Sequence, residues 1–115
     1  MKRRFRLRKT AEFERVRRSG KSFAHPLIVL VVRENEGDSL QIGITAGRSL
    51  GNAVQRNRLK RLMRAAIRTQ LGYIRPGHDL LLIARLPMVE ASFVEIHSAI
   101  QKLLGRADLL TANDD

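Results

Sequence analysis

Apolar residues recur along this chain in two kinds of pattern, which together predict an alternation of helices and strands. A first helix is predicted to begin after Thr10 and to end at Gly20, with Phe13 and Val16 on one side of it. The continuous apolar run PLIVLVV that follows is typical of a strand buried on both faces, and the alternating LQIGIT is typical of a second strand. The polar turn ENEGDS joins the two runs, so we expect these strands to pair as a β-hairpin.

The second half of the chain continues the alternation. A helix is predicted from about Asn52 to Leu71, and a Pro-Gly pair separates it from a third strand, DLLLIAR. The order strand, helix, strand implies a parallel pair joined by a crossover. A last helix opens with the capping box of Ser92 and Glu95 and stops at Gly105. Its expected apolar face consists of Phe93, Ile96, Ile100, Leu103 and Leu104.

These elements predict an α+β fold in a single domain spanning residues 1–115. The order is α-β-β-α-β-α, with a short extra strand near residues 22–24, which gives a small α/β sandwich with a mixed sheet of three to four strands. A chain of 115 residues leaves no room for a second domain. We expect residues 1–9 to form a basic arm and residues from about 106 to 115 to form a frayed tail.

The charge balance favours a polyanionic partner. The chain has 22 Lys and Arg against 11 Asp and Glu, and nucleic acid is the commonest partner of such a protein, with a membrane surface as the rival. The bases are concentrated before residue 79, since residues 79–115 carry three bases and six acids. The absence of Cys excludes a disulfide framework, no apolar segment follows the basic start as in a secretory signal, and the longest apolar run is too short to span a bilayer. We therefore expect a cytoplasmic protein with no membrane partner.

The predicted helix in the middle of the chain carries unbalanced positive charge. No Asp or Glu occurs between Asp38 and Asp79. At 100° per residue, Leu59, Leu62, Met63 and Ala66 fall on one arc, which we expect to face the sheet. Arg56, Lys60, Arg64 and Arg68 follow one another at intervals of four residues, and each such like-charge pair costs an isolated helix about 0.2 to 0.5 kcal/mol. This cost favours a helix whose charges are neutralised by phosphates over a helix face that is merely solvated. The opposite side of the helix carries Asn57, Lys60, Arg61, Arg64 and Arg68, flanked by Arg56 and Arg58.

No residue pattern indicates a catalytic centre. His25, His78 and His97 lie far apart in the sequence and are typical of surface or packing residues, and no phosphate-binding glycine loop with its lysine is present. The spacings of a helix-turn-helix, a zinc finger or a basic zipper are also missing, so the basic helix favours RNA over DNA. The residues predict an RNA-binding module without a catalytic centre of its own.

The segment GNAVQRNRLKRLMR resembles the signature of the bacterial ribonuclease P protein family, with its Arg-Asn-Arg core followed by a Lys-Arg pair and a further Arg on the next turn. The segments RLRKTAEFERVRRSGKSFA, IGITAGRSLGNAV and DLLLIARLP also fall in family order, so the resemblance covers nearly the whole chain. It implies an α/β sandwich with a left-handed βαβ crossover, also found in the second domain of a small-subunit ribosomal protein. This hand is unusual for such connections.

The resemblance also implies a function. Such a protein assists a catalytic RNA that removes the 5′ leader from precursor tRNA, with Mg²⁺ bound mainly by the RNA and with no obligate protein partner. The residues expected to bind the RNA subunit are Asn52, Arg56, Asn57, Arg58, Lys60, Arg61, Arg64 and Arg68. A cleft between the first helix and the sheet is expected to hold the leader through Phe13, Arg17, Val31 and Arg48. Arg17 stands where many relatives have a second aromatic residue, and Val31 where some have Tyr.

Two other functions are alternatives for the basic helix, and the second is disfavoured. A structural RNA-binding protein, such as a ribosomal protein of this size, would use the helix only to anchor ribosomal RNA. A membrane-surface module would need an apolar face for lipid, but the chain has no Trp and the apolar arc suits a sheet.

Overall fold

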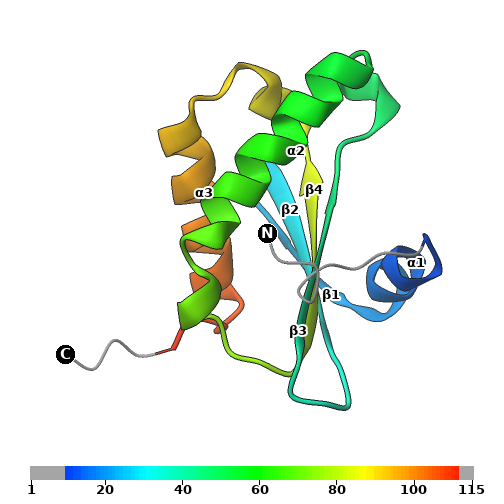
Figure 1. Cartoon of the computed structure of the whole chain (residues 1–115), viewed down its shortest axis with the longest axis vertical. Coiled ribbons are helices and arrows are strands. Elements are labelled where there is room, and N and C mark those ends of the chain that lie inside the picture. The colour runs from blue at the N-terminus through cyan, green and yellow to red at the C-terminus, as the bar shows by residue number, and fades with distance from the viewer. Residues whose placement is uncertain (1–9, 112–115) are drawn as a thin grey trace.

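The computed structural model describes residues 10–111, and these form a four-stranded sheet with helices on both faces (Figure 1). The basic arm expected at residues 1–9 lies outside the described residues, as do residues 112–115. The helices are α1 (Thr10–Ser19), α2 (Ala53–Arg68) and α3 (Phe93–Arg106), with 3-10 turns η2 (Arg48–Leu50), η3 (Leu71–Tyr73) and η4 (Leu86–Glu90). The strands are β1 (Lys21–Ala24), β2 (Ile28–Glu34), β3 (Leu40–Thr45) and β4 (His78–Ala84).

The strand order β1-β2-β4-β3 confirms the mixed sheet and the short extra strand. The parallel crossover is also confirmed, because β3 and β4 are parallel neighbours and α2 lies between them in the chain. The β-hairpin expected between PLIVLVV and LQIGIT is wrong, because β4 lies between β2 and β3 and pairs antiparallel with β2. A direct hairpin would leave β4 at an edge, whereas its continuous apolar run needs an interior position covered on both faces.

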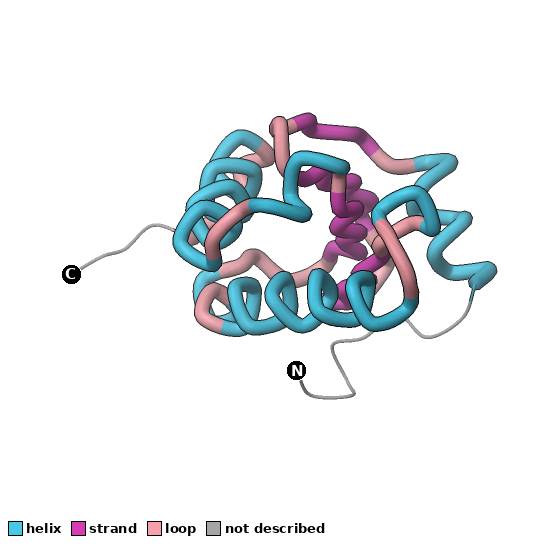
Figure 2. Tube along the Cα trace, turned by 90° about the horizontal axis from the view of Figure 1, so that it is seen from above, coloured by secondary structure: helices cyan, strands magenta, loops and turns pink. Residues whose placement is uncertain are grey.

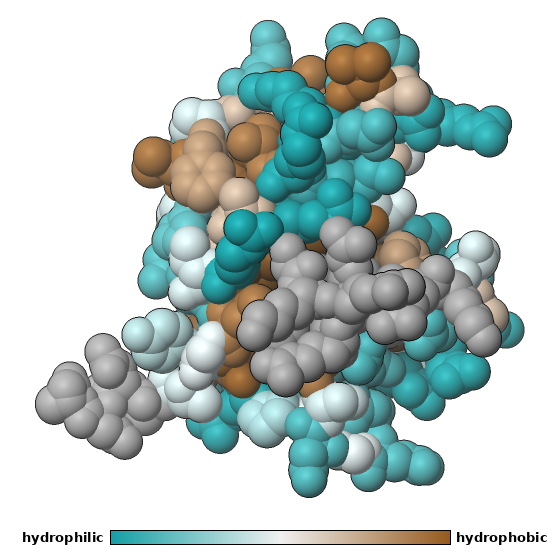
Figure 3. Space-filling model, in the orientation of Figure 1, coloured by the Kyte–Doolittle hydropathy of each residue, from teal (hydrophilic) through white to brown (hydrophobic). Residues whose placement is uncertain are grey.

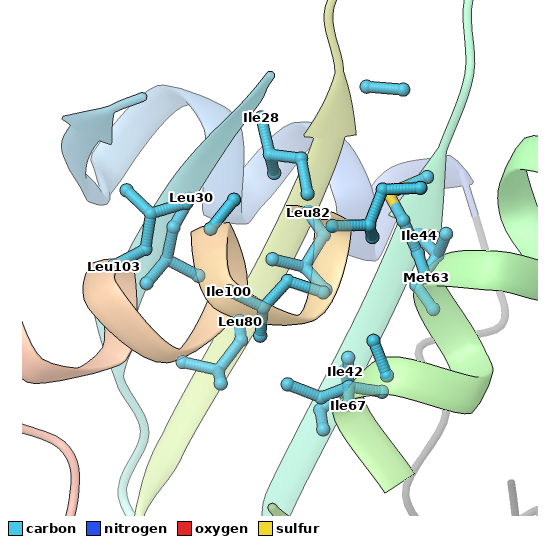
Figure 4. Close-up of a cluster of buried hydrophobic side chains, with 14 of the residues drawn as sticks. Ile28, Leu30, Ile42, Ile44, Met63, Ile67, Leu80, Leu82, Ile100 and Leu103 are labelled. Carbon is cyan, nitrogen blue, oxygen red and sulfur yellow. The ribbon is translucent and has the colours of Figure 1, made fainter. Parts of the chain in front are cut away.

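The helices divide between the two faces of the sheet. Seen from above, α2 and α3 lie together along one face and α1 lies on the other (Figure 2). The larger core lies between the sheet and the helix pair α2 and α3 (Figure 4). A smaller cluster of Val16, Val31 and Leu81 lies under α1. Both central strands therefore bury successive side chains, which explains their unbroken apolar runs.

Two residues expected on apolar helix faces are less buried in the structure than predicted. Ile67 is fully buried in α2 while Leu62 is only half-buried, so the buried arc is rotated toward Ile67 relative to the expected centre. Phe93 does not share the buried face of α3 and is 40% exposed, because it is the first residue of the helix, next to the cap. The other four expected residues of α3 are buried.

Two element ends also differ from the pattern. Helix α2 stops at Arg68, and a separate 3-10 turn covers Leu71–Tyr73, so the helix is shorter than expected. The chain after α3 packs onto the body as far as Thr111 and is not frayed from residue 106. Leu109 is buried, and Leu110 forms a bridge with Ile74. The apolar pair Leu109 and Leu110 gives this segment a reason to pack.

Candidate nucleic-acid interface

The N-terminus of α2 is fixed by a capping box. The Asn52 backbone N–H donates to Gln55 Oε1 at 2.8 Å, and the Gln55 backbone N–H donates to Asn52 Oδ1 at 2.9 Å. Gly51 has a φ of 130°, and a Cβ there would collide with the Gln55 side chain, so the turn before the cap requires glycine. Asn52, expected to bind RNA, therefore uses its side-chain amide oxygen to cap the helix that carries the other expected residues.

Helix α2 presents its charges to solvent because its apolar residues are anchored in the core. Leu59 and Met63 are at most 1% exposed, and Ala66 and Ile67 are fully buried. The rest of the helix carries six cationic residues, which we call the α2 ribbon: Arg56, Arg58, Lys60, Arg61, Arg64 and Arg68. Figure 3 shows hydrophilic side chains gathered along the course of this helix. Arg58, Arg61 and Arg68 of the ribbon are exposed, while Arg56, Lys60 and Arg64 are half-buried.

Three exposed arginines of the α2 ribbon have no acidic partner among the described residues. Arg33 and Asp79 form an ion pair at 3.6 Å away from this helix, and within residues 10–111 no carboxylate pairs with Arg58, Arg61 or Arg68. The Nε of Arg56 is buried, and no described residue accepts a hydrogen bond from it. The helix therefore offers several guanidinium groups whose donors the described part of the protein does not use.

A shallow depression of about 260 Å³ lies between α1 and the end of β3. Phe13 and Arg17 of α1 line it, which brings together two of the four residues expected in the leader cleft. The depression also includes three residues that the sequence did not indicate, Thr10, Glu14 and Thr45. Phe13 is half-buried against the small cluster under α1, so one part of its ring packs inside and another faces the depression.

The other two expected cleft residues lie elsewhere. Val31 is 2% exposed and packs beneath α1 with Val16 and Leu81, so it supports the helix and does not line the depression. Arg48 is exposed in η2 and is not among the lining residues. The close approach of α1 to the sheet explains the burial of Val31. A Cβ on Gly20 would lie 2.6 Å from both Val16 O and Val31 Cγ1.

The α2 ribbon and the depression flank the same edge of the sheet. Helix α2 packs on β3 from one face, and Thr45, the last residue of β3, lines the depression on the other face. Strand β3 is an edge strand, since β4 is its sole partner in the sheet of residues 10–111. A single polyanion that crosses this edge can therefore reach both surfaces.

The described residues show no metal centre and no membrane span. No three His, Asp or Glu side chains among residues 10–111 gather in a way that could hold a metal ion. None of the helices in that range is long and apolar enough to cross a bilayer.

The fold and the charged helix define a class of small basic α+β proteins with an Arg-rich helix on one face of a mixed sheet. The chain belongs to the ribonuclease P protein family, whose model, described as Ribonuclease P, matches residues 1–108. The ribonuclease P protein component of Herpetosiphon aurantiacus is 41% identical over 109 residues, which cover 95% of this chain and 89% of the relative.

Solved structures agree with this assignment. The ribonuclease P protein of Staphylococcus aureus has a TM-score of 0.85 at 30% identity, covering 93% of this chain and 98% of the other. A second structure of that protein, a mutant described as defective in mRNA degradation activity, has a TM-score of 0.85 at 29% identity, with 92% and 90% coverage. The expected α+β fold and the family are therefore confirmed.

Proposed function

We propose that this chain binds the catalytic RNA of ribonuclease P through the α2 ribbon and helps it to remove the 5′ leader from precursor tRNA in the cytoplasm. The observation that carries the proposal is that the exposed guanidinium groups of Arg58, Arg61 and Arg68 lie on one anchored helix and have no acidic partner among residues 10–111. Guanidinium groups bind phosphate oxygens through two parallel hydrogen bonds, and each neutralised phosphate releases counterions. Family membership favours this function over ribosomal RNA anchoring.

The depression between α1 and β3 is the proposed place for the leader. Phe13 offers a partly exposed ring for base stacking, and Arg17 next to it offers a cation for the backbone. Val31 acts from beneath as packing. Arg48, on the exposed turn that follows β3, would contact the strand outside the depression.

The chemistry of cleavage is assigned to the RNA. Hydrolysis of a phosphodiester needs a positioned water and a group that stabilises the developing charge, and metal ions commonly supply both. Mg²⁺ held mainly by the RNA would do so here, while the protein supplies binding and orientation. An assay for the protein without RNA should include an mRNA fragment, because mRNA degradation is named for the Staphylococcus aureus protein.

Two variants separate the proposed surfaces. Arg61→Glu replaces an exposed cation of the α2 ribbon with an anion, so we expect weaker binding to the RNA subunit. Phe13→Leu keeps an apolar side chain in the small cluster but removes the ring. We expect it to leave RNA-subunit binding intact and to lower affinity for precursor tRNA by about 1 kcal/mol or more, with mature tRNA unaffected.

The measurement is equilibrium binding of each variant to the RNA subunit and of each reconstituted complex to both tRNA forms. Thermal unfolding of the free variants is the control. If Phe13→Leu weakened binding to precursor and mature tRNA equally with its fold intact, the depression would not be the leader site.

A further inference from the structure

The bases of the acidic C-terminal third converge on one turn of the fold. Residues 79–115 contain only Arg85, Lys102 and Arg106 as bases. Arg106 Nη1 donates to the carbonyl oxygen of Ala24 at 2.6 Å, and Arg85 Nη1 donates to that of His25 at 3.1 Å. Ala24 is the last residue of β1 and His25 is the first residue of the connection to β2, so both acceptors lie at the same turn.

The pKa of His25 is affected by two of these basic residues. Partial burial, followed by the charges of Lys102 and Arg106, lowers the pKa of His25 below its usual value. The charges of Lys102 and Arg106 and the hydrogen bond from Arg85 thus act on the same residue. Arg106 also lines the neighbouring pocket, and it uses one of its five N–H donors in the bond to Ala24, which leaves donors for a ligand.

Beside this cluster lies a pocket of about 500 Å³, within the range of about 300 to 1,000 Å³ typical of sites for small ligands. Phe23 lines it and packs against the larger core, so the pocket lies on the face of the sheet opposite Phe13. The Lys21 ammonium lies over the Phe23 ring, 5.5 Å from its centre, so the face of the ring that does not pack on the core already holds a cation. The charged residues that line the pocket are Lys21, Arg75, Arg106, Glu34 and Asp108.

We propose that this pocket binds one unpaired nucleotide of RNA, as an additional RNA contact on the α3 face of the protein. The flexible Lys21 side chain would swing off the Phe23 ring so that the base stacks there, and Lys21, Arg75 and Arg106 would hold the adjacent phosphate. Glu34 and Asp108 would accept hydrogen bonds from the amino or imino groups of the base. Two carboxylates beside three cations suit a nucleotide better than a cluster of phosphates.

The inference rests on the proposed RNA-binding function, although its test does not need catalysis. The full chain is titrated with adenosine or guanosine 5′-monophosphate while backbone amide shifts are followed by NMR. We expect saturable shifts at Lys21, Phe23 and Arg75. Phe23→Leu, which keeps an apolar side chain against the core, should weaken binding at least about fivefold, the lower end of base stacking at about 1 kcal/mol.

The matched control is Phe93→Leu, the same substitution at an exposed ring of α3 that does not line the pocket, which should leave these shifts unchanged. Inorganic phosphate is the second titrant. Equal binding of phosphate and nucleotide that survives Phe23→Leu would overturn the nucleotide assignment in favour of a simple anion site. Shifts confined to α1 and α2 would overturn the site altogether.

Phe23→Leu is then tested for binding to the RNA subunit. Phe23→Leu should lower the affinity of the protein for the cognate RNA subunit, with the unfolding midpoint of the free protein as a check on the fold. If the titration fails while the wild-type protein still supports leader removal, the pocket assignment alone is wrong. If the titration succeeds but leader removal does not depend on the protein, the proposed function is wrong.

Discussion

The salt dependence of RNA binding should report how many phosphates the α2 ribbon neutralises. Replacing both Arg58 and Arg61 by Ala removes two exposed cations that have no ion pair within the described residues. Each phosphate contact contributes about 0.7 to 0.9 to the slope of log affinity against log salt. The double variant should therefore lower the magnitude of that slope by about 1.4 to 1.8.

The fold should tolerate this change. Both side chains are exposed, and Ala is the best helix former, so the free energy of unfolding should stay the same or rise slightly. The Arg61–Arg64 and Arg58–Arg61 like-charge neighbours on one helical turn would also be relieved. A loss of RNA affinity in this variant would thus come from the interface and not from unfolding.

The assay is equilibrium binding to the cognate RNA subunit across a salt series, with a control of equal charge. Arg15→Ala with Arg18→Ala also removes two exposed cations, from α1 and outside the depression. The slope should change little in the control. Equal slopes for the two double variants would mean that net charge alone governs binding, which would refute the assignment of phosphate contacts to the α2 ribbon.

Two further predictions concern the helix caps. Asn52→Ala should lower the free energy of unfolding by about 0.5 to 2 kcal/mol, and Asn52→Ser should recover most of it, as measured by urea unfolding; a loss of RNA affinity in Asn52→Ser with stability restored would instead indicate a direct RNA contact. The Ser92 backbone N–H donates to Glu95 Oε1 at 2.8 Å, and this bond, followed by the Ser92 side chain, lowers the pKa of Glu95, so the stability from this ionised carboxylate is present above its unfolded pKa and is lost as the pH falls through its folded pKa. Ser92→Ala removes the side chain but keeps the backbone N–H, so the pKa of Glu95 should rise only part of the way to its usual value in an NMR titration, and a complete return would contradict the backbone hydrogen bond as the main cause.

Local patterns predicted the elements well, because helix periodicity and caps depend on residues close in the sequence. The apolar arc of α2 and the capping box of α3 follow from such spacing. The pairing of β2 with β4 could not be predicted from local spacing, because strand pairing depends on which strands must be covered on both faces. In the sheet, β4 takes the interior position that the β-hairpin prediction denied it.

The candidate sites divide in the same way. The α2 ribbon is a feature of one continuous helix and was predictable, although the inward rotation toward Ile67 leaves Lys60 and Arg64 half-buried. The depression needed tertiary information, since it adds Thr45 to α1 and hides Val31 beneath it. The pocket around Phe23 draws on β1, β2, the segment before β4 and the end of α3, so no single stretch of sequence indicated it.

Reconstitution at low magnesium tests the proposed function most directly. The cognate RNA subunit would be assayed on a precursor tRNA alone, with the purified protein, and with the Arg58→Ala and Arg61→Ala double variant. We expect the wild-type protein to increase leader removal strongly, the double variant to require a higher protein concentration for the same rate, and the protein without RNA to cleave neither substrate tRNA nor an mRNA fragment. Leader removal that is unchanged by saturating wild-type protein, or cleavage that persists in nuclease-treated preparations free of RNA, would contradict the role of this chain as the partner of a catalytic RNA.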